Sequence, residues 1–275
     1  MEKNGKKRRH VMPITCVCVI AALVITSVAC IAHRYVQHER RQNERIQSLE
    51  SLVSKLSAEI QANSTDDIAW LDDGFNYLAI GNSITLHYPV SYWWNEVGMA
   101  ASQTDRDYFH IVSAHLRQDN DAFAGQAFNF VAWEAQGQDR DETLPFLDPY
   151  LSPKLDLVTV QLAENASDLT TYEADYVSLI NYIKERAPGA RILVIGDFWI
   201  KNNRNDLKIN AVNATGVEYV SLDGIAGNSD YYCGMGAVVY GSDGQAHVVE
   251  HKGVAKHPGD RGMQAIADRI IDTLG

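Results

Sequence analysis

The feature that most constrains this chain is a regular alternation of short apolar runs with helical patterns, which starts near Ile68 and continues to the C-terminus. This alternation is typical of a parallel sheet that is covered by helices on both faces. The expected strands are residues 76–80, 128–133, 157–162, 191–195 and 217–222. The sequence therefore predicts a three-layer α/β/α domain, whose functional side chains should follow the strands, where the carboxyl ends of the sheet meet.

Two helices and a hairpin are also indicated. Thr170-Thr171-Tyr172-Glu173 has the pattern of a capping box, and the apolar periodicity after it predicts a helix that ends at Pro188. A last helix is expected over residues 262–274. Residues 238–249 read as two short strands around Asp243-Gly244, a pair that is typical of hairpin turns. We therefore expect a β-hairpin just upstream of the last helix.

Charge is distributed unevenly along the 275 residues. Residues 1–65 hold ten Lys and Arg against five Asp and Glu, whereas residues 66–275 hold fourteen against thirty. A nucleic-acid partner requires a basic face for its phosphates, and the acidic segment lacks one. The charge pattern thus separates an N-terminal region from an acidic domain at residues 68–275, and it argues against nucleic acid as a partner.

The N-terminal region has the pattern of a membrane anchor. Residues 11–32 carry no charged side chain and can cross about 30 Å of hydrocarbon as a helix. The basic residues within 1–10 should stay in the cytoplasm, so we expect a single-pass protein of the cell membrane whose domain lies outside the cytoplasm. A lipoprotein signal at Val28-Ala29-Cys30 and cleavage followed by secretion are the alternatives. All three place the domain outside the cytoplasm.

Residues 33–67 are expected to form a helical stalk and linker. Apolar side chains recur there at alternating steps of three and four, at Ile46, Leu49, Val53, Leu56 and Ile60. This spacing indicates the seam of a short coiled coil, which would make the protein a homo-oligomer. A single amphipathic helix is the alternative. The polar residues 61–67 then connect the stalk to the domain.

Three blocks place polar side chains near the mouth of the predicted sheet. Gly81-Asn82-Ser83 follows the first strand, Ala163-Glu164-Asn165 follows the third, and Lys256-His257-Pro258 precedes the last helix. In this order the blocks resemble the SGNH (GDSL-type) hydrolase family over roughly residues 77–267. Residues 83–102 also resemble a bacterial branch of polysaccharide-directed esterases. The resemblance implies a flavodoxin-like parallel sheet, an acyl-serine intermediate, no cofactor, and an acylated carbohydrate or other ester as substrate.

The resemblance also implies a role for each block. Ser83 would be the nucleophile and His257 the general base, whose near-neutral intrinsic pKa suits that task. The oxyanion would be stabilised by the backbone N–H of Ser83, the Asn165 amide and a backbone N–H from the second strand's block. That block has no glycine, so the third donor stays open within residues 129–131, among them Asn129.

Two further departures from the family pattern stand out. Asn82 replaces the aspartate that is frequent before the serine, a change that the mechanism should tolerate. Val254 occupies the place of the catalytic acid, three residues before the histidine. Two alternatives remain, a Ser–His dyad supported by a backbone carbonyl, or an acid from elsewhere in the chain. The candidate acids are Glu250, Asp243 and Glu134.

Other residues have both a functional and a structural interpretation. Aromatic side chains could stack on a sugar ring or pack in the core or a lid, and they are Trp93, Trp94, Trp133 and Trp199. Asp197 could bind substrate hydroxyls or cap a helix. His247 and His251 are expected to be exposed hairpin residues, because the sequence holds no Cys/His cluster with metal-ligand spacing.

The sequence thus predicts a serine esterase that removes O-acyl groups, above all O-acetyl groups, from polysaccharide. An O-acyltransferase acting on cell-surface glycan would share the same acyl-serine intermediate. A non-catalytic glycan-binding or assembly protein on a hydrolase fold is the third alternative.

Overall fold

A computed structural model describes residues 33, 34, 36, 37 and 68–275, and the first four of these are helical. The predicted cytoplasmic tail, the membrane helix at 11–32 and most of the predicted stalk lie outside the described residues. Within the described ranges, no helix is long and apolar enough to span a membrane. The fold and the site are those of residues 68–275.

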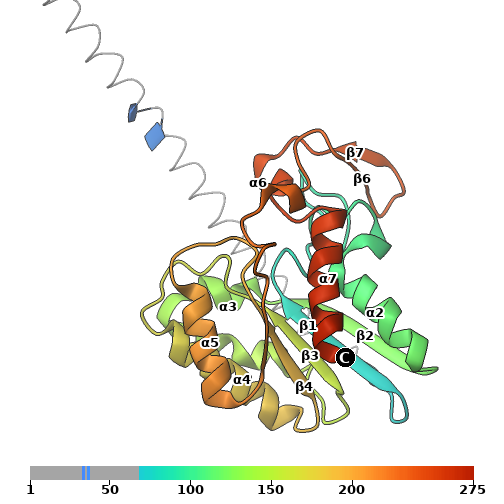
Figure 1. Cartoon of the computed structure of the whole chain (residues 1–275), viewed down its shortest axis with the longest axis vertical. Helices are drawn as coiled ribbons and strands as arrows, with labels where there is room; N and C mark the ends of the chain where they lie inside the picture. Colours follow the sequence, from blue (N-terminus) through green and yellow to red (C-terminus); the bar gives the residue numbers. More distant parts are fainter. Residues whose placement is uncertain (1–32, 35, 38–67) are drawn as a thin grey trace, which may run out of the picture. The chain divides into compact units, whose positions relative to one another are not determined.

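Five parallel strands form the central sheet (Figure 1). They are β1 (Phe75–Gly81), β2 (Phe123–Asn129), β3 (Leu157–Gln161), β4 (Arg191–Ile195) and β5 (Glu218–Val220). Their order is β2-β1-β3-β4-β5, so the chain leaves β1 to one side for β2 and continues on the other side with β3. The topological switch point, where open α/β sheets bind ligands, therefore lies between β1 and β3. Ser83 comes directly after β1.

Helices cover both faces of the sheet, which confirms the predicted three layers. One face packs against α2 (Tyr108–Asp119) and α7 (Asp260–Leu274), which lie side by side in Figure 1. The other face packs against α3 (Val131–Ala135), α4 (Tyr172–Arg186) and α5 (Arg204–Thr215). Side chains of β1 alternate between the two cores, as expected of a strand that is buried on both faces.

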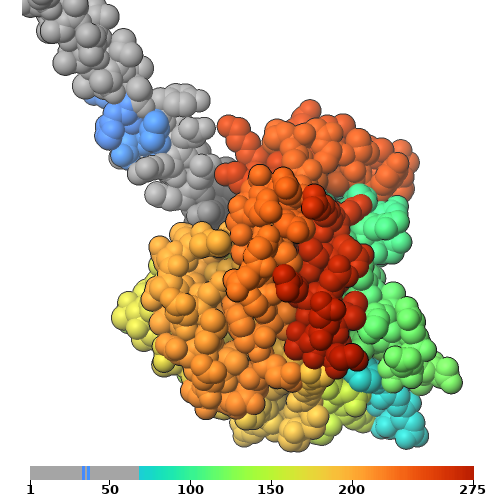
Figure 2. Space-filling view, in the orientation of Figure 1, coloured from blue at the N-terminus to red at the C-terminus, as the bar shows by residue number. Residues whose placement is uncertain are grey.

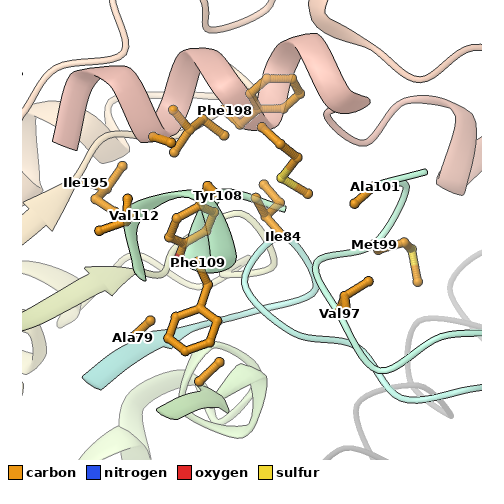
Figure 3. Close-up of a cluster of buried hydrophobic side chains, with 14 of the residues drawn as sticks. Ala79, Ile84, Val97, Met99, Ala101, Tyr108, Phe109, Val112, Ile195 and Phe198 are labelled. Carbon is orange, nitrogen blue, oxygen red and sulfur yellow. The ribbon is translucent and has the colours of Figure 1, made fainter. Parts of the chain in front are cut away.

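The core on the α2 and α7 side anchors the segment after β1. Ile84, the residue after Ser83, is fully buried there. Figure 3 shows it among the side chains of Tyr108, Met99 and Phe198, which come from three separate segments. The Ser83 turn is therefore fixed by packing on its inner side.

The C-terminal segments build the rim above the sheet. The hairpin of β6 (Val238–Tyr240) and β7 (Ala246–Val248) is antiparallel and leads into the short helix α6 (Lys252–Ala255), then α7. Figure 2 shows these orange and red segments as one continuous surface. The predicted hairpin is confirmed, and Gly244 in its turn has a φ of +76°, which glycine adopts without strain. Three 3-10 helices complete the domain, η1 (Thr104–Arg106), η2 (Gly137–Leu147) and η3 (Ser229–Tyr231).

The prediction for the second strand was wrong. The strand ends at Asn129, and the apolar residues after it form the helix α3 instead. β2 is an edge strand whose first half is only partly buried, so Gly125 and Gln126 interrupt the apolar run that would indicate a strand. The apolar residues from Val131 onward have the composition of a strand although they form a helix. The predicted capping box is also absent, because the Thr171 side chain makes no cap bond and donates to Asp175 instead.

Candidate active site

Ser83 and His257 meet at the switch point of the sheet. Ser83 Oγ lies 2.8 Å from His257 Nε2, although the two residues are 174 positions apart. The Ser83 turn is closed by the N–H groups of Thr85 and Leu86, which both donate to the Asn82 carbonyl at 3.0 Å. Gly81 is required where β1 enters this turn, because a Cβ there would lie 1.8 Å from Thr85 Oγ1. The sequence blocks that hold the serine and the histidine are thus brought together.

The second imidazole nitrogen of His257 faces a backbone carbonyl. His257 Nδ1 lies 2.9 Å from the carbonyl oxygen of Gly253 in α6. A carbonyl only accepts hydrogen bonds, so Nδ1 carries the proton and Nε2 is free to accept one from the Ser83 hydroxyl. His251 holds α6 in place, since its Nδ1 accepts from the Val254 N–H at 3.4 Å. His251 is therefore a helix cap and not only the hairpin residue that was expected.

None of the three candidate acids is a hydrogen-bond partner of the His257 ring. Glu134 lies in a different cluster, Asp243 accepts from the Gln245 N–H in the hairpin turn, and Glu250 is exposed. The geometry matches the dyad with a carbonyl support. Burial lowers the pKa of His257 to about 4, and His87 and His251 add to this effect while the Gly253 carbonyl opposes it. The imidazole is thus neutral at neutral pH, as a general base must be.

Trp199 borders the dyad. Its ring packs edge-on against the His257 ring with 4.8 Å between centroids, and its Nε1 donates to the Lys256 carbonyl at 3.0 Å. The Trp199 side chain is only partly buried, so part of the ring that packs against His257 is open to solvent. Of the predicted sugar-stacking residues, Trp93 and Trp133 are fully buried and belong to the core.

Two further aromatic residues form partly exposed stacks with histidines of the C-terminal rim. Trp94 stacks on His247 with ring centroids 4.3 Å apart, and Tyr92 stacks on His251 at 4.2 Å. These pairs tie the segment after Ser83 to the hairpin and to the cap of α6. Among the described residues, no group of three or more His, Cys, Asp or Glu side chains is arranged to hold a metal ion.

Asn129 supports the serine turn. Its Nδ2 donates to the Leu86 carbonyl at 2.7 Å, and its Oδ1 accepts from the Val131 N–H at 3.1 Å. The Phe130 N–H donates to the Gly81 carbonyl at 2.6 Å. The backbone N–H groups of Phe130 and Val131, two candidates for the third oxyanion donor, are therefore already engaged in the fold.

Asn165 lies exposed on the rim after β3 and is held by Glu134. Its Nδ2 donates to Glu134 Oε2 at 2.6 Å. The other carboxyl oxygen, Oε1, accepts from the Ala163 N–H and from Asn82 Nδ2, the latter at 3.0 Å. Glu134 is only 1% exposed, so this carboxyl is a buried support for the Asn165 side chain. Glu134 was one of the three candidate acids for His257, and its hydrogen bonds go to Asn82, Ala163 and Asn165 instead.

A second buried carboxyl, Glu164, shares a donor with Glu134. Asn82 Nδ2 also donates to Glu164 Oε2 at 2.7 Å, while Asn82 Oδ1 accepts from the Ile84 N–H at 3.0 Å. Gln161 Nε2 and the Phe198 N–H donate to Glu164 Oε1. The amide at position 82 thus bridges two carboxyls, a task that an aspartate could not perform without adding a third negative charge.

Asp197 faces the interior, not a substrate. Arg204 Nε lies 2.6 Å and Lys208 Nζ 2.7 Å from its carboxyl oxygens, and all three side chains are buried. The residue that precedes α5 is Asn203, so Asp197 is not the helix cap either. Its role is to support the rim.

Arg204 and Lys208 were missed by the sequence reasoning. Arg204 donates to the carbonyls of Ala163, Glu164 and Trp199 at 2.8–3.0 Å, which joins the loops after β3 and β4. Basic residues four apart on a helix usually mark a solvated face. The one signal in the sequence is their position, because Arg204 and Lys208 lie on the same face of α5 as the buried residues Ala211 and Val212.

No protein-family model and no curated protein matches this chain. Among solved structures, a family two carbohydrate esterase from Clostridium thermocellum in complex with cellohexaose is 18% identical, with a TM-score of 0.47, and the match covers 73% of this chain and 63% of that one. A two-domain esterase active on acetylated mannans, co-crystallized with mannopentaose, is 13% identical, with a TM-score of 0.47 and coverage of 73% and 49%.

An extracellular lipase from Streptomyces rimosus is 14% identical, with a TM-score of 0.43 and coverage of 72% of this chain and 99% of that one. By contrast, the chain spans less than two thirds of the length of the two carbohydrate-active esterases. Identities and TM-scores at this level carry no functional argument. The function rests on the geometry of the site.

Proposed function

We propose that the protein is a serine ester hydrolase of the SGNH type, with Ser83 as nucleophile and His257 as general base. The observation that carries this proposal is the geometry of the dyad, with Ser83 Oγ 2.8 Å from Nε2 and Nδ1 held by the Gly253 carbonyl. Such a pair needs no acid side chain, because the carbonyl fixes the tautomer and stabilises the imidazolium that forms.

The reaction follows from these contacts. Nε2 takes the hydroxyl proton as Ser83 Oγ attacks the ester carbonyl, and the imidazolium then gives that proton to the leaving alcohol. His257 then takes a proton from a water molecule, which attacks the acyl-serine, and returns that proton to Ser83 Oγ as the carboxylic acid is released. The Ile84 and Thr85 N–H groups are bonded to Asn82, which leaves the Ser83 N–H as the backbone donor of this turn that can serve the oxyanion. The Asn165 amide is the second donor.

The substrate that these surroundings favour is an O-acyl ester, above all an O-acetyl ester, of a polysaccharide. Trp199 beside the dyad, with Trp94 and Tyr92 further along the rim, offers flat, partly exposed rings of the kind that bind sugar faces. The resemblance of residues 83–102 to polysaccharide-directed esterases supports the same substrate class.

The proposal includes the location of the enzyme. The basic residues 1–10, the uncharged stretch 11–32 and the apolar spacing within 33–67 support a single-pass membrane anchor and an oligomeric stalk that present the domain outside the cytoplasm. A polymeric substrate that cannot enter the cell is consistent with this arrangement.

The proposal is tested by incubating the full chain with acetylated xylan and acetylated mannan, and with p-nitrophenyl acetate and p-nitrophenyl palmitate. We expect acetate release from the glycans and hydrolysis of the acetate ester well above that of the palmitate ester. Acetyl groups that appear on an added glycan acceptor instead of in solution would show the transferase alternative. Hydrolysis of none of the four esters would contradict the proposed function.

A further inference from the structure

Five charged side chains form one buried cluster behind the rim of the sheet. They are Glu134, Glu164, Asp197, Arg204 and Lys208. Asn82 joins the first two carboxyls, and the two cations contact the third carboxyl directly. The cluster therefore contains three carboxyl groups and only two cations. Because a net charge is costly to bury, one proton on a carboxyl makes the cluster more stable.

The proton belongs on the carboxyl that is farthest from the cations. Asp197 touches both of them. Burial and the charge of Asp197 raise the pKa of Glu164, but Lys208 and Arg204 act against that rise. Glu134 has no cation among its partners, and burial followed by the charge of Glu164 raises the pKa of Glu134 to about 7. Glu134 is thus the carboxyl of the cluster whose protonation the two cations oppose least.

We infer that ionised Glu134 is a positioning residue for the Asn165 amide, and that the Glu134–Glu164 pair thereby makes oxyanion stabilisation depend on pH. The inference rests on the proposed function, in which the Asn165 amide donates to the oxyanion. Its structural basis is the 2.6 Å contact from Asn165 Nδ2 to Glu134 Oε2, a short contact of the charge-assisted kind. The groups that hydrogen-bond to Glu134, which are the Asn82 and Asn165 amides and the Ala163 N–H, are all N–H donors, and this suits the ionised form.

The orientation of the amide explains the effect. Ionised Glu134 holds the nitrogen end of the Asn165 side chain, and the second hydrogen on Nδ2 remains available to the oxyanion. A proton on Glu134 Oε2 would face that N–H, so the amide would turn to offer its oxygen and the donor would be lost. Protonation of Glu134 should therefore reduce the stabilisation of the transition state and leave the binding of the uncharged ester largely unchanged.

The backbone before Asn165 depends on the same carboxyl. Ala163 has a φ of +144°, in a region that favours glycine, and such strain persists only where neighbours hold it. The Ala163 N–H donates to Glu134, and the Ala163 carbonyl accepts from Arg204 at 2.9 Å. Glu134 thus fixes both the side chain and the loop of the oxyanion donor.

Four tyrosines face the pair, and they are Tyr108 of α2, Tyr172 and Tyr176 of α4 and Tyr219 of β5. Burial raises the pKa of all four, so they stay uncharged near neutral pH. Arg140 of η2 packs on the Trp133 ring and is paired with Asp175 at 2.7 Å. The pH dependence of the donor should therefore come from the two carboxyls.

The pH range in which activity changes distinguishes the ionisation of Glu134 from that of His257. The pKa of Glu134 is raised, so kcat should increase as pH rises through neutrality and Glu134 loses its proton. The pKa of His257 is lowered to about 4, so protonation of the base reduces activity only at a much lower pH. The acid limb of the wild-type profile should lie well above the limb that His257 sets.

The test measures kcat and KM against pH for hydrolysis of p-nitrophenyl acetate by the full chain. The variants are Glu134→Gln, Asn165→Ala and the double variant, with the exposed Glu142→Gln as the matched control. At pH 8, Glu134→Gln should lower kcat between about 10-fold and 10³-fold with little change in KM. The pH profile of the remaining activity should keep the decrease at low pH that His257 causes, but lose the decrease near neutral pH.

Two comparisons make the result decisive. If Glu134 acts through the amide, the double variant should be no less active than Asn165→Ala alone, whereas independent roles would multiply the losses. Asn82→Asp adds a fourth carboxyl to the cluster and should shift the acid limb to higher pH. Glu134→Gln leaves two carboxyls with two cations in the cluster, so this variant should fold. If it does not, the shift of the acid limb in Asn82→Asp tests the inference instead.

The outcomes separate the inference from the proposed function. An active wild type whose acid limb is unchanged in Glu134→Gln, or multiplied losses in the double variant, would overturn the positioning role alone. A wild type that neither hydrolyses esters nor reacts with a fluorophosphonate at Ser83 would overturn both.

Discussion

His257→Ala is expected to lower kcat/KM for ester hydrolysis by about 10⁴-fold or more, because Ser83 then has no base to take its proton. Ser83→Ala should cause a loss of similar size, and the double variant should be no worse than either single one, since the two residues act as a unit. The measurement is initial-rate kinetics with p-nitrophenyl acetate near pH 8, where the imidazole of the wild type is neutral.

A second histidine provides the control. His115 lies on α2, and its side chain makes no hydrogen bond with the other described residues, so His115→Ala should retain wild-type kcat/KM. Circular dichroism and thermal unfolding should show that His257→Ala remains folded. A His257→Ala variant that is folded and keeps more than about a tenth of the activity would contradict the assignment of the base, because general-base catalysis alone contributes about 10²–10⁴-fold.

Arg204→Ala should lower the free energy of unfolding by about 3–5 kcal/mol, the usual cost of removing one partner of a buried ion pair. Arg204 is 1% exposed, contacts Asp197 at 2.6 Å and donates to three backbone carbonyls. Its loss leaves these acceptors unpaired and the cluster with one cation for three carboxyls. Urea unfolding measures the change, and Arg204→Lys should recover only part of it, since an ammonium cannot reproduce the planar fork.

An exposed arginine serves as the comparison. Arg186 pairs with Asp148 at 2.9 Å, but both side chains are partly open to solvent, so Arg186→Ala should cost no more than about 1 kcal/mol. Equal destabilisation by the two substitutions would contradict the view that Arg204 joins the loops after β3 and β4. Activity should fall in Arg204→Ala as well, because the Ala163 carbonyl loses the contact that helps to place Asn165.

The sequence was sufficient to predict the parts of the fold that depend on local patterns. Four of the five strands, the hairpin and the last helix lie within a few residues of their expected places. The strand at 128–133 was misplaced because an edge strand does not need a continuous apolar run, and a short buried helix can have one. Periodicity alone cannot distinguish these two cases.

The site was predictable only where family resemblance assigned a residue. Ser83 and His257 were identified in this way, and the structure brings them into contact. The carbonyl of Gly253 could not be identified, because a backbone acceptor has no residue type to recognise. The supporting contacts of Asn82, Glu164 and Arg204 were missed for a different reason, since they join residues that are far apart in the sequence. A charged residue in a sequence is expected at the surface until its partner is known.

The most direct test of the dyad is covalent labelling of the serine. The full chain is treated with a fluorophosphonate, digested and analysed by mass spectrometry, alongside Ser83→Ala, His257→Ala and the control Ser178→Ala on α4. We predict one adduct, on the peptide that contains Ser83, in the wild type and in the Ser178→Ala control, and none in the other two variants. No adduct on the folded wild type, or an adduct on a different residue, would contradict the claim that His257 activates Ser83.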